Sequence, residues 1–346
     1  MTSAARPTAG ATAGATAGAT AGATAGATVE FRGVSKRYAD HTAVDGLSFT
    51  VPAGRICVLV GPSGCGKTTS LKMVNRLIEP TGGAILIDGR DVMSEEPTRL
   101  RRSIGYVIQQ VGLFPHYTIA ENIATVPRLL GWPAARIAAR VDELLALIGL
   151  DPKVGRRYPT QLSGGERQRV GVARALAAEP PVLLMDEPFG AVDPIVRERL
   201  QNEFLRLHRT QKTTVLFVTH DIDEAIKLGD RVAVMRAGAL VQYAPPGELL
   251  AKPADEFVAQ FVGADRGLKL LGLLTVGGAD VDAAVDRSSL PQNAPVIDSS
   301  ATLREALGRI LASASGSAAV VDDDGGYIGA LSLERISAML RQGYRP

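Results

Sequence analysis

Residues 61–68 read Gly-Pro-Ser-Gly-Cys-Gly-Lys-Thr, a glycine-rich stretch that ends in an ammonium group and a hydroxyl group. The stretch fits the pattern G-x-x-x-x-G-K-[ST], follows an apolar run at 56–60 and opens a helical pattern at 68–79. Backbone N–H groups in such a turn converge on an anion, and this strand–loop–helix context is that of a phosphate-binding loop. The predicted phosphate contacts are Gly61, Pro62, Ser63, Gly64, Cys65, Gly66, Lys67, Thr68 and Thr69.

Within this loop, Lys67 supplies a positive charge for the β- and γ-phosphates of a nucleotide, and the Thr68 hydroxyl is expected to bind Mg²⁺. An apolar run at 182–186 ends in an acid, Asp186, which we expect on the same metal ion at the edge of the sheet. The adjacent Glu187 is placed to act as general base toward water. Alone, an Asp-Glu pair after a strand is more often a surface turn.

Two further polar residues follow predicted strands. His220 closes the run at 215–219, and we expect it to contact the γ-phosphate, although a histidine at a strand end is usually structural. Gln109 lies in a turn-like stretch and is predicted to reach the metal ion or the attacking water. Together with Glu187, these are the predicted catalytic residues.

The elements that must position these groups are strands and helices in alternation. Runs at 29–35 and 47–51 alternate like half-buried strands, and further strands are expected at 84–89 and 231–235. Residues 133–149 have apolar side chains at helical spacing. The order of elements predicts an α/β fold with a helix-covered, mostly parallel sheet.

Composition excludes several classes of partner. The 346 residues carry 38 basic and 36 acidic side chains, which gives no electrostatic case for binding nucleic acid. No apolar run reaches the roughly 18 residues of a spanning helix, so a membrane role would act through another protein. The cysteines, Cys57 and Cys65, are expected to be reduced thiols.

The N-terminus is repetitive. Residues 8–27 are five copies of Thr-Ala-Gly-Ala, without the basic start or the strongly apolar stretch of a signal peptide. We expect residues 1–28 to be a disordered leader without function.

A second glycine turn, "LSGGERQR" at 162–169, opens another helix. With the motifs above, it makes residues 29–265 resemble the ATP-binding subunits of ABC transporters. The resemblance implies a P-loop NTPase fold of ABC type, with a mixed sheet core, an antiparallel β subdomain and a helical subdomain. It implies ATP and Mg²⁺ as ligands and ATP hydrolysis as the activity. Glu166 stands where that family most often has glutamine.

The resemblance also implies a head-to-tail homodimer. Ser163, Gly164 and Gly165 of one copy would cap the γ-phosphate of ATP held by the other copy, because a helix N-terminus favours anions. Tyr38 matches the residue that stacks on adenine, although a core position is an alternative, and Asp193 matches the loop that links the two sites. Residues 110–160 match the helical subdomain that grips a permease, with Gln109 reporting the nucleotide state to it.

Within the family, "IGYVIQQVGLFPHYTIAENI" and "DIDEAIKLGDRVAVMRAG" look most like importers of glycine betaine, choline and carnitine. The chain would then work on the cytoplasmic face of the membrane, with permease subunits and, indirectly, a substrate-binding protein. Residues 296–343 are similar to a CBS motif, and 266–295 are either a linker or a degenerate second copy. A capping box, Thr302 with Glu305, is expected to start a helix there.

Three alternatives remain open from the sequence. The transported solute could be an amino acid or a polyamine, because no residue of this chain touches it. A non-transport ABC protein acting on nucleic acid would usually carry a long insertion or two ATPase units, which this chain lacks. A catalytically dead regulator is hard to reconcile with the presence of Lys67, Asp186, Glu187 and His220.

Overall fold

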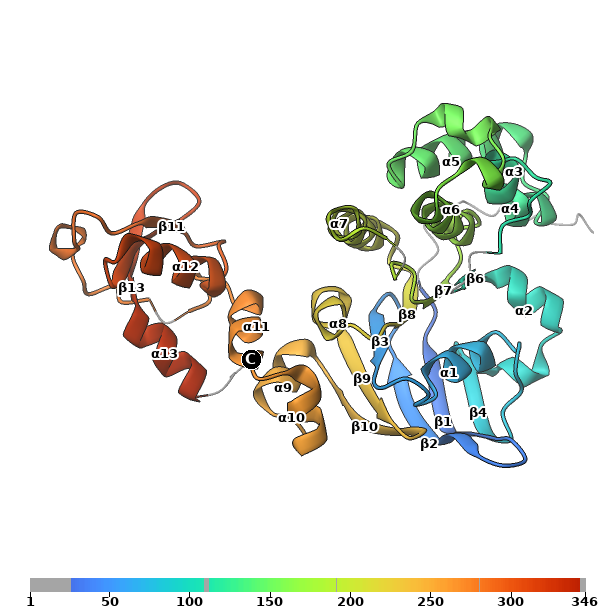
Figure 1. Cartoon of the computed structure of the whole chain (residues 1–346), viewed down its shortest axis with the longest axis horizontal. Coiled ribbons are helices and arrows are strands. Elements are labelled where there is room, and N and C mark those ends of the chain that lie inside the picture. Colours follow the sequence, from blue (N-terminus) through green and yellow to red (C-terminus); the bar gives the residue numbers. More distant parts are fainter. Residues whose placement is uncertain (1–25, 109–111, 191, 280, 343–346) are drawn as a thin grey trace, which may run out of the picture.

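The computed structural model describes residues 26–108, 112–190, 192–279 and 281–342. Two bodies are visible in Figure 1, a larger N-terminal one and a smaller C-terminal one, and helix α11 (Arg266–Leu273) lies between them. The predicted catalytic residues Glu187 and His220 belong to the larger body.

A six-stranded sheet forms the centre of the larger body, in the order β10-β9-β3-β8-β7-β6. All neighbouring strands are parallel except the pair β9 and β10. The bounds are β3 (Ile56–Val60), β6 (Ile104–Val107), β7 (Val182–Asp186), β8 (Thr214–Val218), β9 (Arg231–Arg236) and β10 (Ala239–Ala244). Every residue of β3, β7 and β8 is buried, which explains why these strands read as continuous apolar runs.

A second, antiparallel sheet packs on one side of the first, in the order β2-β1-β4-β5. Its strands are β1 (Val29–Arg37), β2 (Thr42–Val51), β4 (Gly82–Ile87) and β5 (Arg90–Asp91). Helix α1 (Lys67–Val74) shares a hydrophobic core with both sheets, so it lies between them. Phe31 and Phe49 stack in that core with ring centroids 4.5 Å apart.

Helices cover the opposite face of the central sheet. Alternate residues of β3 point to the two sides of the sheet. Cys57 and Leu59 lie in the core that contains α1, whereas Val58 and Val60 lie in a second hydrophobic core beneath the covering helices. The helical part is made of α3 (Ile119–Ile123), α4 (Thr125–Leu129), α5 (Ala134–Leu147) and α6 (Gly164–Leu176). The other helices are α2 (Pro97–Ser103), α7 (Pro194–Gln211), α8 (Ile222–Leu228), α9 (Pro246–Ala251) and α10 (Glu256–Val262). Short 3₁₀ helices are η1 (Val92–Ser94), η2 (Pro152–Arg156), η3 (Pro159–Gln161) and η4 (Arg287–Ser289).

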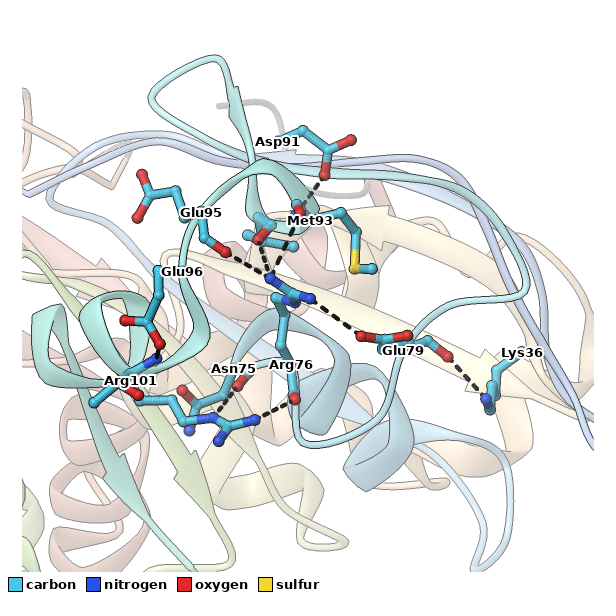
Figure 2. A network of polar contacts seen from close by, with 11 residues as sticks. Lys36, Asn75, Arg76, Glu79, Asp91, Met93, Glu95, Glu96 and Arg101 are labelled. Atoms are coloured by element: carbon cyan, nitrogen blue, oxygen red, sulfur yellow. Dashed lines mark hydrogen bonds and ion pairs between the residues drawn. The ribbon is translucent and has the colours of Figure 1, made fainter.

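Helix α1 ends earlier than the sequence pattern indicated. It stops at Val74, not at residue 79, because Arg76 adopts a left-handed backbone conformation with φ of 48°. The Arg76 guanidinium donates to the carbonyl oxygen of Glu95 at 2.6 Å and to the carboxylate of Glu79 at 3.1 Å (Figure 2). Arg101 of α2 donates to the carbonyl oxygen of Arg76 at 2.6 Å. Contacts from distant segments therefore fix the end of the phosphate-loop helix, which no local pattern could indicate.

The chain is already packed before β1. The backbone N–H of Gly26 donates to the carbonyl oxygen of Lys212. Ala27 is buried, and its N–H donates to the carbonyl oxygen of Pro181. Thr28 donates to the carboxylate of Asp88. The expected leader therefore extends too far by these three residues, and residues 1–25 lie outside the described part of the chain.

The C-terminal body is a three-stranded sheet in the order β11-β12-β13, with its own hydrophobic core. Its elements are β11 (Val296–Asp298), α12 (Leu303–Ser313), β12 (Ser317–Val321), β13 (Tyr327–Ser332) and α13 (Leu333–Gln342). Strands β11 and β12 are parallel, whereas β12 and β13 are antiparallel. The Thr302–Glu305 capping box that starts α12 is confirmed.

The segment 266–295 joins the two bodies through side-chain packing. In α11, Leu270 belongs to the core of the larger body, whereas Leu271 belongs to the core of the smaller one. Val276 also packs in the smaller core, and a β-bridge pairs Asp282 with Ala330 of β13. Part of this segment is therefore built into the C-terminal body.

Candidate nucleotide-binding site

The glycine loop follows β3 and curls over the carboxyl end of the central sheet. Gly66 has φ of 101°, and a Cβ atom at this position would collide with the carbonyl oxygen of Ala43. Gly61 has φ of 147°, and a Cβ atom there would collide with the carbonyl oxygen of Met235. Neither position accommodates a side chain, so the loop keeps the open, backbone-lined form that a phosphate group requires.

Lys67 is the first residue of α1, and its side chain turns back into the loop. Its Nζ atom donates to the carbonyl oxygens of Gly61 at 2.7 Å and Pro62 at 2.9 Å. A weaker contact of 3.6 Å joins it to Cys65 Sγ. The residue is 7% exposed, so its charge is held inside the loop. This placement suits an ammonium group that binds phosphate oxygens.

Thr68 and Asp186 meet although 118 residues separate them. The Thr68 hydroxyl donates to Asp186 Oδ1 at 2.9 Å, and Asp186 is 2% exposed. Burial raises the pKa of the Asp186 carboxyl, and the Thr68 hydrogen bond lowers it. Two adjacent oxygen donors fit Mg²⁺, which takes oxygen ligands and keeps several of its waters. Among the described residues no group of three His, Cys, Asp or Glu side chains could hold a metal, so such an ion would also need phosphate and water ligands.

Glu187 and His220 form a pair beside this position. His220 Nδ1 lies 3.1 Å from Glu187 Oε1, and the His220 side chain is 65% exposed. The pairing follows from the sheet, because the Glu187 N–H donates to the carbonyl oxygen of Val218 at the end of β8. Glu187 has φ of 48°, a left-handed conformation that is uncommon for a residue with a side chain. Such strain is frequent at functional sites.

The predicted catalytic residues Glu187 and His220 are therefore brought together. Asp186 directly precedes Glu187 in the chain. Gln109, predicted as a metal, nucleotide and catalytic contact, lies outside the described residues. The sequence analysis missed Gln168 of α6, whose buried amide donates to the carbonyl oxygen of Glu187 at 3.4 Å. Its position on a helix gave no local signal of this contact.

Tyr38 is a surface residue, not part of the core. It is 43% exposed and stacks on His41 with ring centroids 5.3 Å apart and planes 20° apart. Lys36 Nζ lies 5.1 Å from the centre of the Tyr38 ring. An exposed aromatic face at this point can stack on a base. His41 was not singled out from the sequence, although its spacing from Tyr38 within one turn was visible.

The second glycine turn starts α6. Ser163 is the N-cap, and Glu166 completes a capping box, with Glu166 Oε2 accepting from Ser163 N at 2.7 Å and from Ser163 Oγ at 2.8 Å. These hydrogen bonds lower the pKa of the Glu166 carboxyl, so it is ionised at neutral pH. Ser163 and Gly164 are exposed, whereas Gly165 is half-buried. The start of α6 is therefore accessible to another molecule.

Asp193 is the N-cap of α7. Its carboxylate accepts from the backbone N–H of Ile195 at 3.0 Å, and its side chain lies on the surface. The start of α7 therefore places Asp193 at the surface.

A cavity of about 320 Å³ lies between the central sheet and the helical part. Its lining includes Asn75, Tyr106, Phe114 and Arg174. Asn75 Oδ1 and the Tyr106 hydroxyl oxygen are buried without a hydrogen-bond partner among the described residues.

No helix in the described part of the chain has the length and apolar character to cross a membrane. Comparison with known families gives a match to the ABC transporter model over residues 44–190. Among solved structures, the dimeric structure of a bacterial ABC transporter cassette is similar, with a TM-score of 0.59 and 31% identity. The alignment covers 63% of this chain and 98% of that one.

Three curated relatives are similar in sequence. OsmV of Salmonella typhimurium, an osmoprotectant import ATP-binding protein, is 60% identical over 70% of this chain and 64% of its own length. OpuCA of Bacillus subtilis, a glycine betaine/carnitine/choline transport ATP-binding protein, is 55% identical over 67% and 62%. YehX of Escherichia coli, a glycine betaine uptake system ATP-binding protein, is 48% identical over 82% and 91%.

The chain thus covers less than two thirds of the length of OsmV and OpuCA, but nearly all of YehX. The mixed central sheet, the antiparallel sheet and the helical part correspond to the cassette fold that the sequence predicted. This chain belongs to the ABC transporter family and is built on its ATP-binding cassette.

Proposed function

We propose that this protein is the ATP-hydrolysing subunit of an ABC importer. The observation that carries this proposal is the convergence of three strand ends on one sheet edge. The glycine loop with Lys67 follows β3, the Asp186–Glu187 pair follows β7, and His220 follows β8. Such an arrangement supplies phosphate binding, a metal site and a base in one place.

In the proposed reaction, Lys67 and the backbone of the glycine loop hold the β- and γ-phosphates. Thr68 and Asp186 would hold Mg²⁺, which neutralises charge on the phosphate oxygens when bound. Glu187 accepts a proton from the attacking water, and its contact with His220 Nδ1 fixes the carboxylate. His220, largely exposed, is free to turn its other ring nitrogen to the γ-phosphate.

The site is completed by a second copy of the chain. Ser163, Gly164 and Gly165 at the exposed start of α6 would bind the γ-phosphate of ATP on the partner's glycine loop. Tyr38 would stack on adenine, and Asp193 would lie at the contact between copies. Loss of the γ-phosphate would weaken the dimer, so hydrolysis would open it.

The membrane partner would be a permease on the cytoplasmic face of the membrane, with a substrate-binding protein acting indirectly. The cavity lined by Asn75, Tyr106 and Arg174 supports this assignment, because its volume of about 320 Å³ has room for side chains of a partner. It lies between the sheet and the helical part, where a docked helix of the permease would follow their relative movement. Nucleic acid is not expected as a partner.

The transported solute is proposed to be a quaternary-amine osmoprotectant such as glycine betaine, choline or carnitine. The names of three relatives support the class: OpuCA is named for glycine betaine, carnitine and choline, YehX for glycine betaine, and OsmV for osmoprotectants in general. Another small solute, such as an amino acid or a polyamine, is the alternative.

We assign residues 29–265 to the cassette and 296–343 to a CBS-like regulatory unit, with 266–295 between them. The β11-α12-β12-β13-α13 order and the separate core support a regulatory unit of this kind. Deleting residues 274–346 leaves α11 on the larger body and tests this role. Loss of the response of uptake to osmolarity is expected, and unchanged regulation would contradict it.

Phosphate release by the purified protein with Mg²⁺ and ATP tests the activity, with Lys67→Ala as the inactive control. Dimer formation is tested by light scattering of Glu187→Gln with ATP, which should retain the nucleotide. Uptake of labelled glycine betaine, choline and carnitine, compared with an amino acid and a polyamine in cells with and without the gene, tests the solute. If cells with and without the gene take up every quaternary amine equally, the proposed substrate class is overturned.

A further inference from the structure

Glu224 is a buried carboxylate that the mechanism above does not use. It lies on α8, four residues after His220, and is 8% exposed. Gln201 Nε2 of α7 donates to Glu224 Oε1 at 3.0 Å. The Glu224 N–H donates to Asp221 Oδ1 at 3.2 Å, and the Asp221 N–H donates to Thr219 Oγ1, just before His220, at 3.1 Å. Burial raises the pKa of the Glu224 carboxyl, and the neighbouring Thr219 side chain lowers it. Because a buried carboxylate needs its hydrogen bonds, it fixes the residues that supply them.

Gln201 continues this contact along α7. One helical turn earlier, Arg197 Nη2 donates to the carbonyl oxygens of Val192 at 3.1 Å and Gly190 at 3.4 Å. These carbonyls belong to the loop that ends at Asp193, and the Arg197 backbone N–H donates to the carbonyl oxygen of Asp193 at 2.7 Å. The positive charge of Arg197 also lowers the pKa of the Glu224 carboxyl.

Side chains of one helix thus hold two loops of the site. Toward α8, the contacts reach Thr219 and the start of the His220 loop; toward the N-terminus of α7, they reach Gly190 and Val192. Helix α7 has 18 residues, and its buried Leu200 and Phe204 belong to the hydrophobic core on the helix-covered side of the central sheet. A helix of this length transmits a displacement at one loop to the other, because its own hydrogen bonds keep it rigid.

We propose that Glu224 is a positioning residue that couples the His220 loop to the Asp193 loop through Gln201 and Arg197 on α7. The inference rests on the proposed function. There, His220 acts on the nucleotide of its own copy, and Asp193 lies at the contact with the partner. Through this coupling, a change at the nucleotide site of one copy alters the position of its Asp193 loop, which lies at the contact with the partner's site.

A purely structural role predicts something different. If Glu224 only packs α8 against α7, its removal lowers stability and leaves the Asp193 loop unchanged. A matched control is available, because Glu198 of α7 also faces α8, where its carboxylate lies 4.0 Å from Lys227 Nζ, but it is exposed. Glu198→Gln removes a carboxylate between the same two helices without touching the network.

The experiment is hydrogen–deuterium exchange of the full-length protein without nucleotide, followed at the amides of Gly190 and Val192. These amides donate within their own turn, to Glu187 and Phe189, so their exchange reports opening of that turn. Glu224→Ala is expected to speed their exchange roughly three- to tenfold, the range typical of contact networks. Glu224→Gln, which keeps the hydrogen-bond acceptor, is expected to restore native exchange, and Glu198→Gln to leave it unchanged.

Unchanged exchange of Gly190 and Val192 in Glu224→Ala would overturn the proposal. If that variant does not fold, Gln201→Leu replaces it, since this change removes the donor and retains the side-chain volume. The readout requires no ATP hydrolysis, so its failure is distinct from failure of the proposed function. For an active protein, the turnover of Glu224→Ala should fall by about tenfold with little change in KM for ATP, because the phosphate loop is untouched.

Discussion

Asp186 is a buried carboxylate at the proposed Mg²⁺ site, and its replacement by asparagine should separate stability from function. In the protein without ligands, Thr68 Oγ1 donates to the carboxylate. The neighbouring charge of Glu187 raises the pKa of Asp186, and the charges of Lys72 and Lys67 lower it. Burial is the larger effect and raises its pKa. Asp186→Asn retains an acceptor for Thr68 and removes the buried charge.

The expected gain follows from the desolvation cost. Burying a poorly compensated polar group costs about 1–3 kcal/mol in proteins. For a body of this size, each kcal/mol changes Tm by roughly 2–4 °C. In EDTA at about pH 7.5, Asp186→Asn should therefore unfold roughly 2–12 °C above the native protein, which is the product of these two ranges.

The pH dependence has a definite sign. Because the pKa of Asp186 is raised on folding, its favourable contribution is complete below the unfolded pKa and is lost as pH rises through the folded value. The difference between variant and native protein should therefore shrink as the pH falls through the raised pKa of Asp186, because the protonated carboxyl is then neutral like the asparagine amide. Asp151→Asn is the matched control, because Asp151 is an exposed N-cap that asparagine can replace.

Addition of Mg²⁺ and ATP should raise the Tm of the native protein more than that of Asp186→Asn. A ligand at a hundredfold excess over its Kd stabilises the native protein by about 2.7 kcal/mol. The variant lacks the charged ligand for Mg²⁺, so its Tm should rise less. Thermal unfolding followed by circular dichroism measures both states. A lower Tm of the variant in EDTA, or equal shifts of both proteins with Mg²⁺ and ATP, would refute this reasoning.

Three further predictions concern separate parts of the molecule. Gly66→Ala places a Cβ against the carbonyl oxygen of Ala43 at φ of 101°, so ATP binding measured by calorimetry should be lost, and retained affinity would contradict the loop geometry. Glu187→Gln should slow phosphate release by on the order of a hundredfold or more, and hydrolysis at the native rate would exclude Glu187 as the base. Thr302→Ala removes the cap of α12 and should lower the stability of the C-terminal body by about 1 kcal/mol, measured by chemical denaturation, whereas Thr302→Ser should not.

Local chemistry explains which parts of the site were visible in the sequence. The glycine loop and the strands β3, β7 and β8 are determined by nearby residues, and parallel pairing then brings their carboxyl ends to one edge. The capping box of α12 was recognised from its S/T-x-x-E pattern. The same pattern at Ser163 and Glu166 was equally visible, but it was interpreted only as a phosphate turn.

Contacts between distant segments account for what the sequence did not indicate. The end of α1 depends on Arg76, whose partners lie near residue 95, and the Glu224–Gln201 bond joins two helices that each look ordinary alone. The expected linker contains α11, whose adjacent Leu270 and Leu271 face two different cores. Helical periodicity in a sequence indicates an apolar face that packs into one core, so it does not reveal a helix that packs into two.

The start of α6 combines opposing electrostatic effects, and their balance bears on how the proposed dimer opens. Backbone N–H groups and the helix dipole attract a phosphate, whereas the ionised Glu166 carboxylate repels one. That carboxylate also holds the Ser163 hydroxyl at 2.8 Å, so a γ-phosphate must compete with it for the same proton. A contact that is both attractive and contested depends strongly on the full charge of the γ-phosphate. In the proposed dimer, hydrolysis would remove that phosphate and Glu166 would again accept from the Ser163 hydroxyl, so the start of α6 would return to the form it has in the single chain.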